Sequence, residues 1–180
     1  MTESKSASTK TTEWVGLGLG ANLGDPGACL SQALTRIRAL PETEIKAISP
    51  SYWTPPWGVN EPQPDYLNAV CLIRTGLSPE DLLMALQVIE KDLGRVRGRE
   101  RYAARTLDLD ILFFGDRVIH TADLHVPHPR LHQRGFVLLP LADIAPYFEV
   151  VGLDRVDHLL EALDEDALDG IRPAHIHLAP

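Results

Sequence analysis

"RTLDLDILFFG", residues 105–115, contains two aspartates inside a run that otherwise has the pattern of a buried strand. Successive side chains of a strand point to opposite faces of the sheet, so Leu107 and Leu109 share one face. Asp108 and Asp110 then lie side by side on the other face. Two neighbouring carboxylates repel each other, and partial burial makes the repulsion more costly. A bound metal cation at this face would relieve that cost.

The segment immediately before this strand is strongly basic. Residues 94–105, GRVRGRERYAAR, carry five arginines against one glutamate, a local charge of +4 in a chain of formal net charge −8. A solvated basic loop is the ordinary interpretation of such a segment. Two features argue against it here: the basic residues are all arginine, which suits bidentate recognition of phosphate, and they lead directly into the two carboxylates.

Magnesium is usually held by one or two carboxylates together with substrate phosphates and water, so Asp108 and Asp110 are candidate ligands. Asp-x-Asp alone is a weak pattern that would indicate only an exposed strand face. Next to the arginines, it indicates two-metal phosphoryl or nucleotidyl transfer.

The remaining chain predicts an α+β fold. Strands are expected at residues 14–21, 44–53, 66–75 and 106–114, helices at 28–39 and 79–93, a final strand at 142–151 and a short helix at 156–163. The four prolines of residues 54–65 indicate a loop. The order strand–helix–strand–strand–helix–strand is that of a ferredoxin-like sandwich, an antiparallel-rich sheet with helices packed on one face.

The segment GLGLGA, residues 16–21, matches the dinucleotide-binding pattern G-x-G-x-x-A. The glycines lie within a strand rather than after one, and no convincing βαβ unit follows, so this interpretation is discounted. We expect instead a strand edge where the backbone comes close to another group.

Bulk properties narrow the class of protein. A length of 180 residues suits one domain, and the negative charge disfavours nucleic acid and anionic membrane as partners. No apolar run is long enough to span a membrane. Cys29 and Cys71 lie far apart, as expected of buried thiols in the reducing cytoplasm. Residues 1–12 are expected to be a disordered tail.

Several motifs together resemble one family. These are GLGANLGD (residues 18–25), YWTPPWG…QPDYLNAV, the arginine segment with RTLDLDILFFG, and VPHPRLHQRGFVLLPLADIAP. In this order they resemble the 6-hydroxymethyl-7,8-dihydropterin pyrophosphokinases of folate biosynthesis, over residues 13–150. Residues 151–180 lie outside the resemblance as a C-terminal extension of unknown role.

The resemblance implies a ferredoxin-like fold and transfer of diphosphate from ATP to the pterin hydroxymethyl group, with release of AMP. It implies two Mg²⁺ ions held by Asp108 and Asp110. A monomer is expected, although the sequence itself does not give the oligomeric state. The positions that match ATP-binding residues are Gln87, Glu90, Arg95, Arg97, Arg101, Arg105, His128 and Arg134, of which Arg97 and Arg105 are expected to be catalytic. The positions that match the pterin pocket are Thr54, Pro55, Tyr66, Asn68 and Phe136. Tyr66 and Phe136 can stack on a flat heterocycle, and Asn68 can recognise its donor and acceptor edge.

Three positions depart from the family pattern: Tyr102 stands where tryptophan can occur, Asp123 where arginine can contact ATP, and His125 where threonine can. Two other functions are possible on a similar sheet. A nucleotidyl cyclase or polymerase-like enzyme would not need the stacking pocket. An RNA-binding module would present Asp108 and Asp110 to phosphate, which they would repel without a metal.

Overall fold

The structure, a computed structural model, describes residues 11–56, 62–94 and 106–179. Its centre is a six-stranded sheet in the order β5-β1-β4-β3-β8, with β2 also paired to β4. The strands are β1 (Glu13–Ala21), β2 (Thr43–Ile48), β3 (Tyr52–Thr54), β4 (Tyr66–Thr75), β5 (Asp108–Phe114) and β8 (Arg172–Pro173). The pairings between them are antiparallel. A separate hairpin joins β6 (Ile119–His120) to β7 (His125–Val126).

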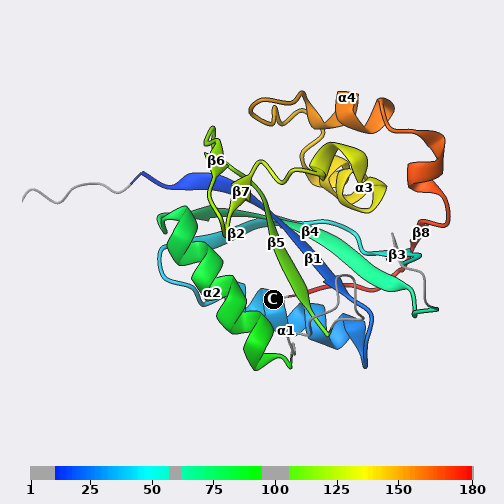
Figure 1. Ribbon diagram of the computed structural model, residues 1–180. Helices are drawn as coiled ribbons and strands as arrows, with labels where there is room; N and C mark the ends of the chain where they lie inside the picture. Colours follow the sequence, from blue (N-terminus) through cyan, green and yellow to red (C-terminus); the bar gives the residue numbers. More distant parts are fainter. Residues whose placement is uncertain (1–10, 57–61, 95–105, 180) are drawn as a thin grey trace, which may run out of the picture.

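Two helices, α1 (Pro26–Arg38) and α2 (Pro79–Asp92), cover one face of the sheet (Figure 1). Each begins at a capping side chain followed by proline. Asp25 accepts a hydrogen bond from the Ala28 amide, and Ser78 accepts one from the Asp81 amide. These caps satisfy amides that the first turn leaves without helical partners, and proline needs no such partner.

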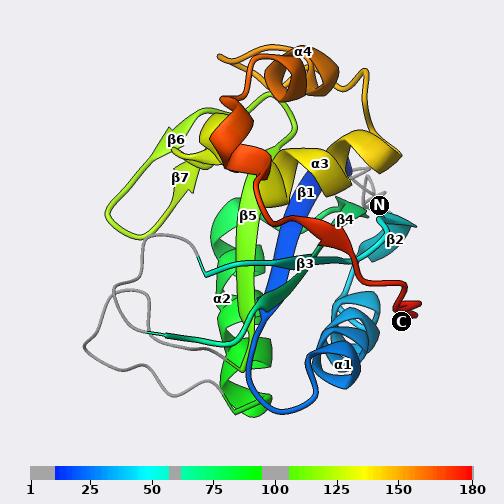
Figure 2. The same cartoon turned by 90° about the vertical axis from the view of Figure 1, so that its right-hand side faces the viewer.

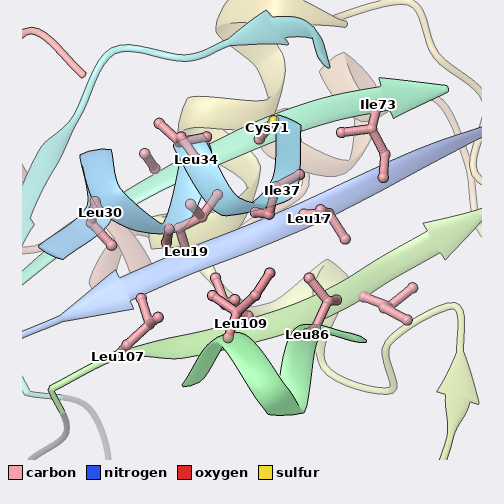
Figure 3. Close-up of a cluster of buried hydrophobic side chains, with 14 of the residues drawn as sticks. Leu17, Leu19, Leu30, Leu34, Ile37, Cys71, Ile73, Leu86, Leu107 and Leu109 are labelled. Carbon is pink, nitrogen blue, oxygen red and sulfur yellow. The ribbon is translucent and has the colours of Figure 1, made fainter. Parts of the chain in front are cut away.

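The main core lies between these helices and the sheet. Leu17, Leu19 and Leu109 project from the strands toward Leu34 of α1 and Leu86 of α2 (Figure 3). All five side chains are at most 5 % exposed. The predicted alternation of residues 107–111 is therefore confirmed, because the leucines enter this core while Asp108 and Asp110, on the other face, stay half-exposed.

A second core lies on the opposite face of the sheet, under α3 (Gly135–Ile144) and α4 (Val156–Glu161) (Figure 1). Short 3-10 helices flank it at η1 (Leu131–Gln133) and η2 (Glu165–Leu168). Val70 and Leu72 of β4 point into this second core, while Cys71 and Ile73 point into the first. The central strand β4 is therefore apolar on both sides, as a strand between two layers must be.

The α+β, ferredoxin-like prediction is confirmed in element order and in strand pairing. Three details of the prediction are wrong. Helices lie on both faces rather than one. The strand expected at 44–53 is two strands, separated at Pro50, which has no amide to donate. The strand expected at 142–151 does not form, because residues 135–144 are a helix whose apolar side packs on the sheet.

Both cysteines are free thiols, Cys71 fully buried and Cys29 partly so. Burial raises the pKa of the Cys71 thiol to about 12. Within the described ranges, no helix combines the length and apolarity needed to cross a membrane. The expected tail falls mostly on residues 1–10, outside the described residues.

Candidate active site

Gly16, Gly18 and Gly20 lie on the same face of β1, so this strand contributes no side chains to that face in the middle of the sheet. Gly20 pairs with Asp108 of β5 on one side and with Asn68 of β4 on the other. Gly18 pairs in the same way with Asp110 of β5. The backbones that carry the carboxylates and the amide are two inter-strand spacings apart, about 10 Å. Because Gly20 has no side chain, the Asn68 amide can reach over β1 from one side.

Above this face lies a cavity of about 240 Å³ between the sheet and the start of α3. It is lined by Gly18, Leu19, Gly20, Thr54, Pro55, Tyr66, Asn68, Ala69, Asp108, Asp110, Leu112, His128, Arg134, Phe136 and Val137. All five residues that the resemblance assigned to pterin are among them. So are both predicted metal ligands and two of the predicted ATP contacts.

On one side of the cavity the two aspartates form a paired carboxylate site. The Asp110 side chain is 40 % exposed, and its Oδ2 lies 3.7 Å from Nη1 of Arg134. No group of three or more metal-ligating side chains occurs among the residues that the structure describes. The carboxylate oxygens of Asp108 and Asp110 are hard donors, which fit a hard cation such as Mg²⁺ that takes its remaining ligands from phosphate and water.

On the other side, a buried amide is held in a fixed orientation. The Nδ2 of Asn68 donates a 2.6 Å hydrogen bond to Oγ1 of Thr54. Asn68 is 8 % and Thr54 2 % exposed, so water competes little with this bond. The bond turns the Asn68 Oδ1 toward Gly20, where an added Cβ would lie only 2.8 Å away. The glycine thus leaves room for the amide that Thr54 orients.

An arginine side chain packs against the aromatic wall of the cavity. The Arg134 guanidinium lies 5.5 Å from the centroid of the Phe136 ring. This distance is within cation–π range, so the ring and the charge support each other's position. Arg134 therefore connects the aromatic wall to Asp110 on the carboxylate side.

His128 is neutral at pH 7. Burial, together with the nearby positive charge of Arg134, lowers its pKa to about 4. Its Nδ1 accepts a 3.1 Å hydrogen bond from the Arg130 amide, so a neutral ring carries its proton on Nε2. That nitrogen lies 3.5 Å from Nη1 of Arg134, which can only donate, so the two donors together suit an anionic oxygen placed between them.

Two predicted ATP contacts lie outside the cavity lining. Gln87 and Glu90 are on α2, which packs on the far face of the sheet. Glu90 is 3 % exposed, and its Oε1 accepts a 2.7 Å hydrogen bond from the amide of Leu109. This bond holds the backbone of β5 at the residue between the two aspartates.

Other predicted residues cannot be placed. Arg95, Arg97, Arg101 and Arg105 lie outside the described residues, as does Tyr102. Asp123 and His125 belong to the β6–β7 hairpin and its turn, and neither lines the cavity.

The sequence analysis did not assign Gly18, Gly20 or the apolar lining residues to the site. The alternation GLGLGA was a usable signal, because it predicted a close approach to the backbone. The expectation of a strand edge was wrong, since β1 lies between β5 and β4. The approaching groups are side chains of those two neighbours: Asn68 meets Gly20, Leu112 meets Gly18 and the Phe113 ring meets Gly16.

Comparison with known proteins gives a consistent result. The family model described as 7,8-dihydro-6-hydroxymethylpterin-pyrophosphokinase (HPPK) matches residues 16–146. The chain belongs to this family. A relative from Pseudomonas aeruginosa, named 2-amino-4-hydroxy-6-hydroxymethyldihydropteridine pyrophosphokinase, is 44 % identical over 153 residues, which cover 85 % of this chain and 91 % of the relative. A relative of the same name from Haemophilus influenzae is 46 % identical over 129 residues, covering 72 % and 79 %.

The fold has counterparts among solved structures. The crystal structure of Plasmodium falciparum HPPK-DHPS A437G with STZ-DHP matches with a TM-score of 0.68 at 15 % identity. The match covers 86 % of this chain and 46 % of the Plasmodium chain, so this chain spans less than half of that protein. At this identity the likeness concerns the fold alone, and it agrees with the α+β arrangement of this HPPK.

Proposed function

We propose that this pyrophosphokinase transfers diphosphate from ATP to the hydroxymethyl group of 6-hydroxymethyl-7,8-dihydropterin in folate biosynthesis, giving AMP and the pterin diphosphate. The observation that carries the proposal is the floor of the cavity. A fixed, buried amide and a pair of carboxylates lie on its two sides, with a glycine between them. One ligand can therefore bind by hydrogen bonding and the other through cations, with their reacting groups meeting over Gly18 and Gly20.

The pterin belongs on the amide side. A pterin ring is flat and has an edge of alternating donors and acceptors, which Asn68 can pair with because Thr54 already fixes its orientation. Tyr66 and Phe136 supply aromatic surface on the same side. Pro55 closes the wall beside Thr54.

The ATP phosphates belong on the carboxylate side. Asp108 and Asp110 would hold two Mg²⁺ ions, which when bound neutralise phosphate charge and favour displacement at phosphorus. The neutral His128 can donate from Nε2 to a phosphate oxygen. Arg134, at 3.7 Å from Asp110, can turn to phosphate once a cation takes its place beside that carboxylate.

In this arrangement the chain contributes positioning and electrostatics. The pterin hydroxyl oxygen attacks the β-phosphorus and loses its proton to solvent. The bond from that phosphorus to the bridging oxygen breaks, and AMP leaves with this oxygen. Holding the two reactants in line lowers the entropic cost of the encounter. Glu90 contributes indirectly, since it holds the backbone of Leu109 between the two carboxylates.

The ATP-binding roles of Gln87, Glu90, Arg95, Arg97, Arg101 and Arg105 remain predictions from the resemblance. So do the monomeric state, the cytoplasmic location and the absence of nucleic-acid or membrane partners.

The test is to incubate the protein with ATP, Mg²⁺ and the reduced hydroxymethylpterin, and to identify the nucleotide product. The proposal predicts AMP in equal amount to pterin diphosphate, with EDTA stopping the reaction. A nucleotidyl cyclase would release pyrophosphate without needing pterin, and a binding module would leave ATP intact. Either of these results, or formation of ADP, would refute the proposal.

A further inference from the structure

We propose that residues 165–178, near the C-terminus, are a positioning element for the pterin side of the cavity, acting through the ion pair between Arg172 and Asp65. The proposal rests on the proposed function, because it assigns this segment an effect on one of the two substrates.

The segment crosses the edge of the sheet and joins its two faces (Figure 2). After η2 it pairs as β8 with β3, where Trp53 faces Arg172. Two 2.9 Å hydrogen bonds continue the pairing at Ser51, which accepts from the Ala174 amide and donates from its hydroxyl to the Ile176 carbonyl. Strand β3 ends at Thr54, so the segment runs along the strand that carries the hydroxyl orienting Asn68.

The far end of the segment is fixed in the main core. The Leu178 side chain is 6 % exposed and belongs to the cluster under α1. Ile176 packs closely on the same helix, since a Cβ added to Gly27 would lie 3.2 Å from its Cγ2. This anchorage makes the segment a fixed support for what it contacts on the way.

Two of those contacts are with the pterin side of the cavity. Gly170 lies so close to Pro55 that an added Cβ would be 2.6 Å from the proline Cγ. Nη1 of Arg172 lies 2.8 Å from Oδ2 of Asp65, the residue before Tyr66. Pro55 and Tyr66 both line the cavity. The segment therefore contacts the chain on both sides of residues 56–64.

A third contact reaches the opposite wall. The carbonyl of Ala167 in η2 presses against Gly135, where no Cβ could be accommodated. Gly135 begins α3 and precedes Phe136. Residues 167–172 thus connect the Phe136 wall to the Pro55 and Tyr66 wall.

The carboxylate side lies at the opposite edge of the sheet from this segment. Strand β8 is at one end of the sheet order and β5, with Asp108 and Asp110, is at the other. The segment should therefore influence pterin binding more than ATP binding.

The experiment compares Arg172→Ala with wild type by titrating each variant with the reduced pterin and, separately, with Mg²⁺ and a non-hydrolysable ATP analogue. We expect the pterin Kd to rise about two- to tenfold, the lower part of the range for coupled residues, because Arg172 acts through Asp65; the ATP-analogue Kd should be unchanged. Thermal unfolding should change little, since exposed ion pairs contribute little to stability.

Arg36→Ala is the matched control. It removes the same charge from an ion pair of similar kind, Arg36 Nη1 to Asp92 Oδ2 at 3.2 Å, between α1 and α2. The arginine side chains of the two pairs are similarly exposed, 56 % for Arg172 and 52 % for Arg36. The control variant should bind pterin as wild type does.

The charge-swapped double variant Asp65→Arg, Arg172→Asp should recover most of the lost pterin affinity, which general destabilisation would not explain. An unchanged pterin Kd in Arg172→Ala, an equal loss for both ligands, or no recovery in the swap would each overturn the inference. Failure of the proposed function is distinguishable, because the wild-type protein itself would then not bind the pterin.

Discussion

At the scale of single residues, the site depends on the absence of side chains at Gly18 and Gly20. Side chains of the neighbouring strands can approach the β1 backbone here because β1 itself contributes none: Asn68 lies over Gly20 and Leu112 over Gly18. A close packing of polar groups over backbone is sensitive to one methyl group, since overpacking a rigid interior costs about 1–3 kcal/mol.

We therefore predict that Gly20→Ala weakens pterin binding at least about tenfold. The new Cβ would lie 2.8 Å from the Asn68 Oδ1, so the amide must turn away from the orientation that Thr54 gives it. Gly18→Ala is the comparison on the same strand face. Its Cβ would meet the Leu112 Cδ2 at 3.4 Å, at the limit of ordinary contact, and would leave Asn68 in place. Equal pterin Kd values for the two variants, measured by titration, would contradict the assignment of the amide.

His128 gives a prediction about pH. Its pKa is lowered from 6.5 to about 4 in the folded protein, so between these values the unfolded chain binds a proton that the folded one does not. The free energy of unfolding should thus fall as pH falls from about 6.5 to 4, by at most about 3 kcal/mol from this residue.

The measurement is urea unfolding across that pH range for wild type and His128→Gln. The variant should lose less stability on acidification. His132→Gln, at an exposed position, controls for removal of a histidine as such. If wild type and His128→Gln had parallel pH profiles, His128 would not be held neutral by its surroundings.

At the scale of elements, the layer that carries Phe136 is tied to the strand that carries Thr54. The hydroxyl of Tyr52 in β3 donates a 2.5 Å hydrogen bond to Oδ2 of Asp143 in α3. Tyr52 is 9 % exposed, and burial together with this bond raises its pKa to about 12. The bond therefore persists as pH rises through the ordinary tyrosine range.

Tyr52→Phe should lower the free energy of unfolding by about 1.5–3 kcal/mol, the range for a hydrogen bond to a charged group. Tyr147→Phe is the control, since Tyr147 is 75 % exposed and loses only a solvated hydroxyl. Chemical denaturation at pH 7 measures both. A loss in Tyr52→Phe no greater than in Tyr147→Phe would mean that the bond does not join the two layers.

Helices and strands with a clear hydrophobic periodicity were predictable from the sequence. A helix that is apolar on all sides, because it is buried between layers, was not. The strand at 66–75 and the helix at 79–93 agree with β4 and α2 to within one residue. Residues 135–144 are apolar almost throughout, which fits a strand as well as a helix pressed between other layers. These residues form a helix because they pack in the second core, and no local sequence pattern reveals that core.

The site residues were likewise predictable in part. The residues that the resemblance assigned to pterin, and both aspartates, do line one cavity. Gln87 and Glu90 do not line it, because α2 packs on the other face of the sheet, and their contact with ATP stays a prediction. The role of Glu90 as a support for β5 required the pairing of a buried carboxylate with the Leu109 amide to be seen.

At the scale of the whole molecule, the sheet order separates the two halves of the site. Strand β5 brings the carboxylates from one edge, β4 and β3 bring the amide side from the other, and β1 lies between them. Helices α1 and α2 cover the far face (Figure 1), and the near face carries α3, the second core and the cavity. A substitution in one half should therefore weaken the binding of one ligand and leave the binding of the other unchanged.

The most direct test is a pair of titrations on two variants, Asn68→Ala and Asp110→Asn, each with the reduced pterin and with Mg²⁺ plus a non-hydrolysable ATP analogue. We predict crossed losses. Asn68→Ala should lose about 1–3 kcal/mol of pterin binding, because a buried ligand group is left unpaired, and keep its affinity for the nucleotide. Asp110→Asn should lose affinity for the Mg²⁺–nucleotide complex and keep its affinity for pterin. Equal losses of both ligands in both variants would contradict a site divided by the glycines of β1.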